Sequence, residues 1–400
     1  MIYPKYVTTI IDRLEQAGES AYIVGGSLRD TLIGVTPHDY DVTTSALPQR
    51  TAEIFSDMRV INTGIKHGTV TVICDGEAIE ITTFRIDGSY TDSRRPDSVR
   101  FTDDISEDLS RRDFTVNAMA YSHKRGLVDP FEGQQDLQNR LIRAVGDASL
   151  RFAEDALRIM RAFRFSAQLD FDIEQNTLLG CKKMANGLCN IARERIGNEL
   201  IRLITSPSPS RPLMLMKQNG IFPHVFGAYV PSDKLINLIE HTPRTVDARL
   251  GFILCEADRD TAREILKELR CSAKQITGAL AVLTGASQSV CTPADARKLI
   301  ANVGIYAHSA ACASELLGIS PKGATELTLR QQDTPCSLRE LNINGKDLAA
   351  IGAKGKQIGN ILNTLLEKVI CSPEFNDRNT LMKLAEQMID KGNGTDGTAR

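Results

Sequence analysis

The spacing of apolar residues changes character once along this 400-residue chain, near residue 137. Before that point, short apolar runs of strand length alternate with helical stretches. After it, apolar residues recur at helical spacing, as in the stripe formed by Phe152, Ala156, Ile159, Met160, Phe163 and Ala167. The chain is therefore predicted to fold as an α/β head followed by an all-α region, an arrangement that suits an enzyme holding an extended ligand.

The chain is long for a single compact core, so two or more domains are expected. Pro- and Ser-rich breaks at 205–212, near Pro231 and Pro293, and at 331–336 divide the helical part. The predicted divisions are a head over 1–137, helical segments over 138–205, 206–330 and 331–390, and a disordered end over 391–400, which is rich in Gly, Thr and charge.

Composition excludes several classes of protein. Hydrophobic residues make up 42% and charged residues 24%, as in an ordinary globular protein. No apolar run approaches the roughly 20 residues of a membrane span, and the first residues do not resemble a secretory signal. The nine cysteines are scattered, odd in number and without a CxxC pair, which favours reduced thiols in the cytoplasm. The six histidines are isolated in sequence, so no histidine metal site is predicted.

The net charge of −2 argues weakly against tight nonspecific binding of nucleic acid. Basic residues between positions 85 and 164 are nevertheless almost all arginine, whose planar fork suits phosphates and base edges. They include Arg94, Arg95, Arg100, Arg111, Arg112, Arg140, Arg143, Arg151, Arg158 and Arg161. Because acidic residues are interspersed, a surface on which these arginines form salt bridges is an equally good alternative to nucleic-acid binding.

The first 137 residues show several local signals. Ser27 is expected to cap a helix over 28–33 that Gly34 ends. Gly64 and Gly68 between apolar pairs indicate a hairpin. The remaining predictions are a helix over 6–17 and strands over 21–24, 38–44, 60–61, 69–74 and 78–84.

Asp39 and Asp41 lie two residues apart on the strand predicted over 38–44. The period of two places both carboxylates on one face of the strand. Two converging oxygen ligands are what Mg²⁺ prefers beside substrate phosphates. Such a pair alone is more commonly a solvated surface feature, so its neighbours decide its meaning.

A glycine turn, Gly25-Gly26-Ser27-Leu28-Arg29-Asp30, precedes this pair between a strand and a helix. Glycine lets the backbone approach a phosphate, and a helix N-terminus presents free N–H groups to it. Arg29 is a candidate for a bidentate phosphate contact. The turn matches neither a Walker A loop nor GxGxxG. A turn that can bind phosphate, followed by a pair of carboxylates that can bind a metal ion, is a more specific signal than either feature alone.

Glu80 is the candidate for a third carboxylate. It projects from the predicted strand over 78–84, on the face opposite Ile79 and Ile81. An exposed strand glutamate without a function is the alternative.

Three sequence segments carry a resemblance to a known family. Gly25-Gly26-x-x-Arg29-Asp30 followed by Asp39-x-Asp41 resembles the head of the class II tRNA nucleotidyltransferase and bacterial poly(A) polymerase family. The segments 111–120 (RRDFTVNAMA) and 151–165 (RFAEDALRIMRAFRF) are similar to its second motif and its nucleotide-selecting helix. The matches follow the family order over roughly residues 20–170. Beyond them, the likeness rests on 193–196 (RERI) and 344–347 (NGKD).

The resemblance implies a nucleotidyltransferase head with a small mixed sheet flanked by helices, then an all-α neck, body and tail, the tail binding tRNA. The implied activity is addition of C, C and A to the 3′ end of tRNA from CTP and ATP, with Mg²⁺ held by Asp39 and Asp41. Gly26 and Arg29 would hold the triphosphate. By family position, Arg112 would contact the nucleotide and Asp113 the ribose. No membrane association and no protein partner are predicted.

Asp155 and Arg158 are three apart on the predicted nucleotide-selecting helix and would therefore be neighbours. A carboxylate accepts and a guanidinium donates, which matches the amino donor and ring-nitrogen acceptor of both cytosine and adenine. Guanine and uracil present the reversed order, at a cost of about 1–3 kcal/mol for each unpaired group. Arg161 and Arg164 extend this face. A plain i,i+3 salt bridge is the alternative.

The polar segment over 83–97 corresponds to a loop that the family uses for adding the final A, which disfavours a CC-only enzyme. Two other functions remain open. One is an A-adding enzyme or poly(A) polymerase of the same superfamily. The other is a catalytically silent RNA-binding protein, which the presence of both Asp39 and Asp41 disfavours.

Overall fold

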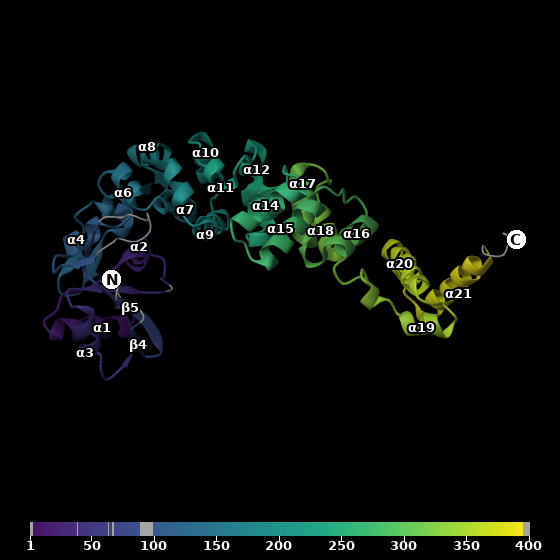
Figure 1. Ribbon diagram of the computed structural model, residues 1–400, viewed down its shortest axis with the longest axis horizontal. Helices are drawn as coiled ribbons and strands as arrows, with labels where there is room; N and C mark the ends of the chain where they lie inside the picture. Colours follow the sequence, from purple (N-terminus) through teal and green to yellow (C-terminus); the bar gives the residue numbers. More distant parts are fainter. Residues whose placement is uncertain (1–2, 38, 63, 66–67, 89–98, 395–400) are drawn as a thin grey trace. The chain divides into compact units, whose positions relative to one another are not determined.

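The computed structural model describes residues 3–37, 39–62, 64–65, 68–88 and 99–394, which divide by their contacts into two compact units, Met1–Val230 and Pro231–Arg400 (Figure 1). Each unit is described by itself. His38, most of the segment predicted as a polar loop, including Arg94 and Arg95, and the chain end over 395–400 lie outside the described residues.

A mixed sheet forms the centre of the first unit. In the described part of the chain it has seven strands, in the order β3-β4-β5-β2-β1-β8-β9. Only β2 and β5 run parallel to each other. The sheet confirms the predicted small mixed sheet. Its strands are β1 (Ala21–Val24), β2 (Asp41–Thr44), β3 (Arg59–Ile61), β4 (Thr69–Cys74), β5 (Glu77–Thr83), β8 (Ala120–Ser122) and β9 (Gly126–Val128).

Short helices flank this sheet. The clearest example is α1 (Lys5–Gln16), which confirms the helix predicted over 6–17 and buries Val7, Ile10, Ile11 and Leu14 at helical spacing. The others are α2 (Gly25–Leu32), α3 (Pro48–Ile54), α4 (Ile105–Ser110), the 3₁₀ turn η2 (Thr115–Asn117) and α5 (Gly133–Gln138).

The strand and helix beside the glycine turn differ from the prediction. Strand β2 begins at Asp41, because its partner β1 ends at Val24, which pairs with Asp41. Asp39 therefore lies in a bend before the strand and not on it. Helix α2 begins at Gly25 and not after Ser27, whose hydroxyl donates to the carbonyl of Val24 at 3.0 Å. The positive φ of Gly25 (71°) lets the chain turn directly from strand into helix.

Residues 83–88 of the segment predicted as a polar loop over 83–97 lie within the described part of the chain. Strand β6 (Arg85–Asp87) pairs antiparallel with β7 (Val99–Phe101). At its base, the backbone N–H of Thr102 donates to the carbonyl of Phe84 at 3.0 Å.

The rest of the first unit is mainly helical. It contains α6 (Ala148–Glu154), α7 (Leu157–Leu169), α8 (Gln175–Met184), η3 (Ala185–Asn190), α9 (Arg193–Ile204), α10 (Ser210–Gln218) and α11 (Phe222–Phe226). The predicted apolar stripe is buried, but the chain breaks between α6 and α7 within it. Two short parallel strands, β10 (Leu141–Ile142) and β11 (Asp172–Ile173), interrupt the predicted run of helices.

The described part of the second unit is entirely helical, as the sequence predicts. Its helices are α12 (Asp233–Leu238), η4 (Ile239–His241), α13 (Val246–Ile253), α14 (Arg259–Glu268), α15 (Ala273–Ala286), α16 (Pro293–Val303), η5 (Gly304–Tyr306), α17 (Ala307–Leu317), α18 (Ala324–Arg330), η6 (Leu338–Glu340), α19 (Gly345–Ala350), α20 (Lys356–Cys371), η7 (Pro373–Phe375) and α21 (Arg378–Gly394). Helix α21 continues through 391–394, so the predicted disorder over 391–400 is wrong for those four residues.

Two apolar clusters stabilise this unit. One gathers residues of α16, α17 and α18 around Leu299 and Ala310. The other gathers residues of α19, α20 and α21 around Leu365 and Leu381. Arg297 of α16 joins the two groups of helices. Its buried guanidinium donates to the carbonyl oxygens of Ile370 and Cys371 at the end of α20, at 2.6 and 2.9 Å.

We expect Arg297→Met to loosen α20 and α21. The last carbonyl groups of a helix need partners outside it, and each one left unpaired costs about 1–3 kcal/mol. Hydrogen exchange of the amides near Ile370 should therefore accelerate by about tenfold or more, as measured by mass spectrometry. Lys298→Met, at the exposed next residue, is the matched control. Equal protection in both variants would contradict the joining role of Arg297.

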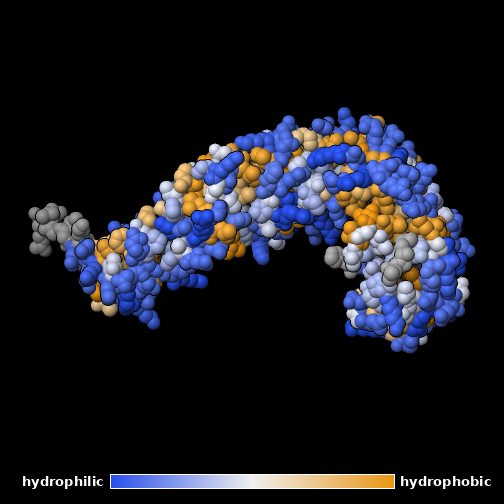
Figure 2. Space-filling view, turned by 180° about the vertical axis from the view of Figure 1, so that it is seen from behind, coloured by the Kyte–Doolittle hydropathy of each residue, from blue (hydrophilic) through white to orange (hydrophobic). Residues whose placement is uncertain are grey.

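Hydrophilic residues cover most of the face shown in Figure 2, and apolar residues form separate patches there. Among the residues described, no helix has both the length and the apolar character to cross a membrane.

Candidate active site

A cavity of about 610 Å³ in the first unit brings the sequence motifs together. Its walls come from the start of α2, from β2 and the bend before it, from the segment around η2, and from α7 and α9. The lining residues are Gly25, Gly26, Ser27, Arg29, Asp39, Asp41, Arg111, Arg112, Asp113, Asn117, Asp155, Leu157, Arg158, Arg161, Arg164, Phe165, Gln168, Arg195 and Arg202. All predicted site residues except Glu80 are among them.

Glu80 lies beside the carboxylate pair although it does not line the cavity. It is the partner of Asp41 in the parallel pairing of β2 with β5, and its side chain is exposed. Burial raises the pKa of Asp41, and the negative charges of Glu80 and Asp39 raise it further, while Arg112 opposes them. Negative charge therefore gathers around Asp41, where a divalent cation would relieve the repulsion, although the ligand atoms of Asp39, Asp41 and Glu80 do not all lie within 4.8 Å of one another.

The glycine turn lies directly against the carboxylates. A Cβ atom added at Gly25 would lie 3.4 Å from Nη1 of Arg112 and 3.8 Å from Oδ2 of Asp41. A Cβ atom at Gly26 would lie 3.6 Å from Nη2 of Arg29. The absence of side chains at both positions leaves the first turn of α2, with its free N–H groups, open to the cavity.

Arg29 is held by protein partners, which the sequence did not show. Its side chain is buried, and it donates to Oδ1 of Asp30 and to Oδ1 of Asn117, both at 2.8 Å. Its guanidinium also lies over the ring of Phe165, 5.2 Å from the centroid. These contacts fix Arg29 at the wall of the cavity and fasten α2 to the segment around Asn117.

Arg112 is positioned by a buried carboxylate. Its Nη2 atom donates to Oδ2 of Asp108 at 3.2 Å, and Arg111 donates to Oδ1 of Asp108 at 2.7 Å. Burial acts to raise the pKa of Asp108, but the charges of Arg112 and Arg111 outweigh it, and the pKa lies below its ordinary value. Asp108 also accepts the backbone N–H of Arg85 at 3.3 Å, which connects β6 to the cavity wall.

Asp155 and Arg158 both line the cavity, but they do not share a helix. Asp155 lies in the break after α6 with an extended backbone, while Arg158 belongs to α7. The prediction of two neighbours on one helix face is therefore wrong. The alternative, a plain salt bridge between Asp155 and Arg158, is wrong as well. Arg158 pairs with Glu154 at 2.7 Å, and the described residues show no ion pair between Asp155 and Arg158. Asp155 accepts instead from the N–H of Leu157 at 3.0 Å and from Arg195 at 2.9 Å.

Arg161 and Arg164 are each paired with a carboxylate. Arg161 donates to Asp113 at 2.7 Å, and Arg164 donates to Glu199 at 2.5 Å. Burial acts to raise the pKa of Asp113, but the charge of Arg161, the hydrogen bonds from Asn117 and Arg161 and the charge of Arg158 together outweigh it and lower that pKa to about 2. Both guanidiniums lie over the ring of Phe165, at 5.1 and 4.0 Å from its centroid. Phe165 thus supports the guanidiniums of this wall, and each of the two is also held by a carboxylate.

Several wall residues were not assigned as site residues from the sequence. Arg195 belongs to the segment 193–196, whose similarity to the family was noted, and Arg202 follows it by seven residues on α9. That spacing of about two helical turns places both on one face, so periodicity could have identified Arg202. Asn117 and Phe165 lie within the similar segments 111–120 and 151–165, and Gln168 follows Arg164 by four residues on α7, so motif position and helical spacing could have identified them.

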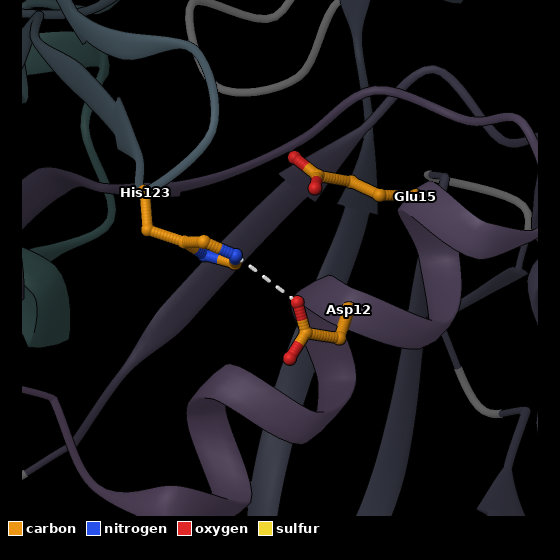
Figure 3. Close-up of side chains that lie close together, drawn as sticks. All are labelled: Asp12, Glu15 and His123. Carbon is orange, nitrogen blue, oxygen red and sulfur yellow. Dashed lines mark ion pairs between the residues drawn. The ribbon is translucent and has the colours of Figure 1, made fainter.

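A second cluster of possible metal ligands, Asp12, Glu15 and His123, lies outside this cavity (Figure 3). His123 is therefore not isolated in space, and its Nε2 atom lies 3.1 Å from Oδ1 of Asp12. Glu15 already holds the ammonium of Lys124 at 2.9 Å and the hydroxyl of Ser122 at 2.7 Å. A bound ammonium competes with a metal ion, so the cluster is better described as an ion-pair link between α1 and the β8–β9 turn.

Family models match two regions of the chain. Residues 21–143 match the poly A polymerase head domain. Residues 170–231 match the probable RNA and SrmB-binding site of polymerase A. The first region holds the carboxylates and the glycine turn, and the second holds α9 with Arg195 and Arg202.

Relatives match the chain over nearly its whole length. The CCA-adding enzyme of Leuconostoc mesenteroides is 34% identical, with 96% of each chain covered, and that of Ligilactobacillus salivarius is 35% identical, with 97% of each covered. The crystal structure of the Bacillus stearothermophilus CCA-adding enzyme in complex with CTP is 30% identical, covers 100% of both chains and has a TM-score of 0.81. With this identity over both full lengths, the chain belongs to the family of CCA-adding enzymes.

Proposed function

We propose that this protein adds C, C and A to the 3′ end of tRNA from CTP and ATP, without a nucleic-acid template. The observation that carries the proposal is the single cavity in which the carboxylate pair, the open first turn of α2 and the Asp155–Arg158 wall meet. Each of the three features is common alone, and together they supply what nucleotidyl transfer with base selection requires.

The reaction is an in-line attack of the RNA 3′-hydroxyl on the α-phosphate, with pyrophosphate leaving. Asp39 and Asp41, with Glu80 beside them, would hold Mg²⁺, which when bound activates the hydroxyl and offsets the charge of the phosphates. The free backbone N–H groups in the first turn of α2, around Gly26, would face the triphosphate. Arg112 adds a positive charge next to the carboxylates, and Arg29 keeps the turn in place.

Base selection rests on hydrogen-bonding groups that stay available in the cavity. Asp155 accepts one bond on each oxygen, and a carboxylate has about four acceptor sites, so it can still accept the amino group of cytosine or adenine. Three of the five N–H donors of Arg158 bond to Arg151, Glu154 and Arg111. This leaves the N–H of Nε and one N–H of Nη2, which would donate to the ring nitrogen. The pair need not lie on one helix for this role.

The names of the relatives favour full CCA addition over addition of A alone or of a poly(A) tail. The Bacillus stearothermophilus relative was solved with CTP, as expected for an enzyme that adds C. We further propose that 138–205 serves as a neck with the nucleotide-selecting wall, 206–330 as a body and 331–390 as a tRNA-binding tail. We also propose that the protein acts in the cytoplasm, where tRNA is its substrate.

Acceptor RNAs separate the candidate functions. Purified protein is incubated with tRNA lacking CCA, tRNA ending in CC, or an unrelated RNA, with CTP and ATP singly and together. Extension of the first two to a complete CCA end supports the proposal. Tails on any RNA would instead indicate a poly(A) polymerase, and no incorporation would indicate an RNA-binding protein.

Removing divalent cations should stop the reaction. In the same assay, excess chelator is expected to abolish incorporation and added Mg²⁺ to restore it, because without the cation nothing offsets the negative charges of the carboxylates and of the phosphates. Binding of tRNA, measured by fluorescence anisotropy, should persist in chelator. Incorporation that continues without divalent cations would contradict the proposed role of Asp39 and Asp41.

A further inference from the structure

The bend that carries Asp39 is not held by the pairing of strands. Strand β2 begins at Asp41, and neither Asp39 nor Tyr40 before it belongs to a helix or a strand. Asp39 is exposed, whereas Tyr40 is buried. Because Tyr40 is the residue between the two carboxylates, contacts that hold its ring also limit where Asp39 can lie.

Two tyrosines from the start of the chain contact the ring of Tyr40. Tyr3 precedes α1, and Tyr6 lies in the first turn of that helix. The ring centroids of Tyr3 and Tyr40 are 6.1 Å apart at an interplanar angle of 84°, and those of Tyr6 and Tyr40 are 6.2 Å apart at 79°. Both contacts have the edge-to-face geometry that aromatic rings favour. Two such contacts with different residues restrict both the position and the tilt of the ring of Tyr40.

Tyr3 also contacts two other elements of the first unit. Its ring centroid lies 5.7 Å from that of Tyr121 on β8. Its side chain shares a hydrogen bond with Thr31 of α2, whose hydroxyl donates to the carbonyl of Ser27 at 2.8 Å. Burial and the neighbouring Tyr121 raise the pKa of Tyr3 to about 12, so its phenol stays protonated at neutral pH. Tyr3 therefore connects the carboxylate bend with the helix that carries the glycine turn.

The apolar core of α1 is built from other residues. The buried residues of this helix are Val7, Ile10, Ile11 and Leu14. Tyr3, Tyr6 and Tyr121 are only half-buried. The match to the family's head domain begins at residue 21, so Tyr3 and Tyr6 also lie outside it. What sets these two rings apart from ordinary core residues is their contact with the one side chain between the carboxylates.

We propose that Tyr3 and Tyr6 are positioning residues, which hold Tyr40 and thereby keep Asp39 in place to share a divalent cation with Asp41. This role rests on the proposed function, because that function requires the cation. Without the two edge contacts, the ring of Tyr40 is free to turn and the bend before β2 adopts several positions. Asp39 is then in place only part of the time, so the apparent affinity for the cation falls although both carboxylates are still present.

Binding of Mn²⁺ alone to the full chain, measured by electron paramagnetic resonance, tests this role without nucleotide or RNA. Tyr3→Leu and Tyr6→Leu are each expected to raise the Kd for Mn²⁺ by about tenfold, which is typical when a residue that orients a metal ligand is replaced. Tyr6→Phe keeps the ring and should bind Mn²⁺ as the wild type does. When Asp39→Ala is already present, Tyr6→Leu should cause no further rise in Kd, because Tyr6 acts only through Asp39.

Incorporation of CTP gives a second measurement. In Tyr3→Leu and Tyr6→Leu, the half-saturating concentration of Mg²⁺ should rise by the same factor as the Kd for Mn²⁺. The rate at saturating Mg²⁺ should stay close to that of the wild type, because excess cation selects the chains in which Asp39 is in place. A general loss of structure would lower the rate at every concentration of Mg²⁺.

Tyr229→Leu is the matched control. Tyr229 makes an edge contact with Phe226 at 6.1 Å in the same unit and does not line the cavity. This variant should bind Mn²⁺ as the wild type does, and thermal melting checks that all variants fold. The proposal would be overturned by an unchanged Kd for Mn²⁺ in Tyr3→Leu and Tyr6→Leu, or by an equal rise in Tyr229→Leu. A further rise when Tyr6→Leu is added to Asp39→Ala, or equal Mn²⁺ binding by the wild type and Asp39→Ala, would also overturn it.

The Mn²⁺ measurement is independent of nucleotide addition. If the wild-type protein binds Mn²⁺ through Asp39 but adds no nucleotides, the proposed function fails while the role of the tyrosines is still tested. If the wild-type protein completes CCA ends and the leucine variants bind Mn²⁺ normally, only the role of the tyrosines fails.

Discussion

Replacing Asp41 with asparagine is expected to abolish nucleotide incorporation, by about 10³-fold or more in kcat, while tRNA binding persists. Asp41 is the central carboxylate, beside Asp39 and opposite Glu80. The substitution keeps the shape of the side chain but removes the charge that a divalent cation requires. A loss of about 4 kcal/mol in transition-state stabilisation corresponds to this factor. Single-turnover extension of tRNA with CTP measures it, and Asp39→Ala should behave alike.

Asp75→Asn is the matched control for this experiment. Asp75 is an exposed carboxylate of the same sheet, in the turn between β4 and β5, and its positive φ of 52° is one that asparagine also adopts. This variant should extend tRNA at the wild-type rate. If Asp41→Asn retained incorporation within a few-fold of Asp75→Asn, the metal-binding role of the carboxylate pair would be refuted.

Asp155→Ala is expected to lower the preference for CTP over UTP by about 10- to 100-fold. Without the carboxylate, the cavity loses the acceptor for the amino group of cytosine, and uracil no longer leaves a buried acceptor unpaired. The ratio of kcat/KM for the two nucleotides measures this preference. Adenine uses the same acceptor, so preference for ATP over GTP should fall as well.

Arg195 complicates that experiment, because it loses its partner when Asp155 is removed. A second variant, Arg195→Met, separates the two effects. It should reduce kcat/KM for CTP while keeping the preference for CTP over UTP, since the acceptor itself remains. Glu194→Ala, at an exposed carboxylate next to Arg195 that does not line the cavity, is the control. If Asp155→Ala kept the wild-type preference for CTP over UTP, the proposed role of Asp155 in reading the base would be refuted.

Features encoded within a few residues were predictable from the sequence. Helix α1, strand β1 and the turn at Gly25 follow from local spacing and backbone freedom, although α2 begins at Gly25 and not after Ser27. The small mixed sheet and the helical remainder follow from the change in period near residue 137. The pairing of Asp39 with Asp41 in the cavity also needed only their local spacing, even though strand β2 begins at the second of them.

Features that depend on segments distant in sequence were not predictable. The alternation of Glu80 with Ile79 and Ile81 identified it as a candidate, but its position beside Asp41 comes from the parallel pairing of two strands, and no local pattern fixes that register. The carboxylate that positions Arg112 is Asp108, whose burial arises from packing of α4 against the β6–β7 ladder. The sequence placed Asp155 on a helix because its apolar stripe continues, whereas the chain breaks there to let Asp155 accept from Arg195.

The central claim is that one cavity adds C, C and A in that order without a template. The most direct measurement is the sequence of the nucleotides added to tRNA lacking CCA when CTP, ATP, UTP and GTP are all present with Mg²⁺. The account predicts a single product that ends in CCA and is not extended further. A product ending in CC alone, a run of A, or incorporation of U or G by the wild-type protein would contradict it.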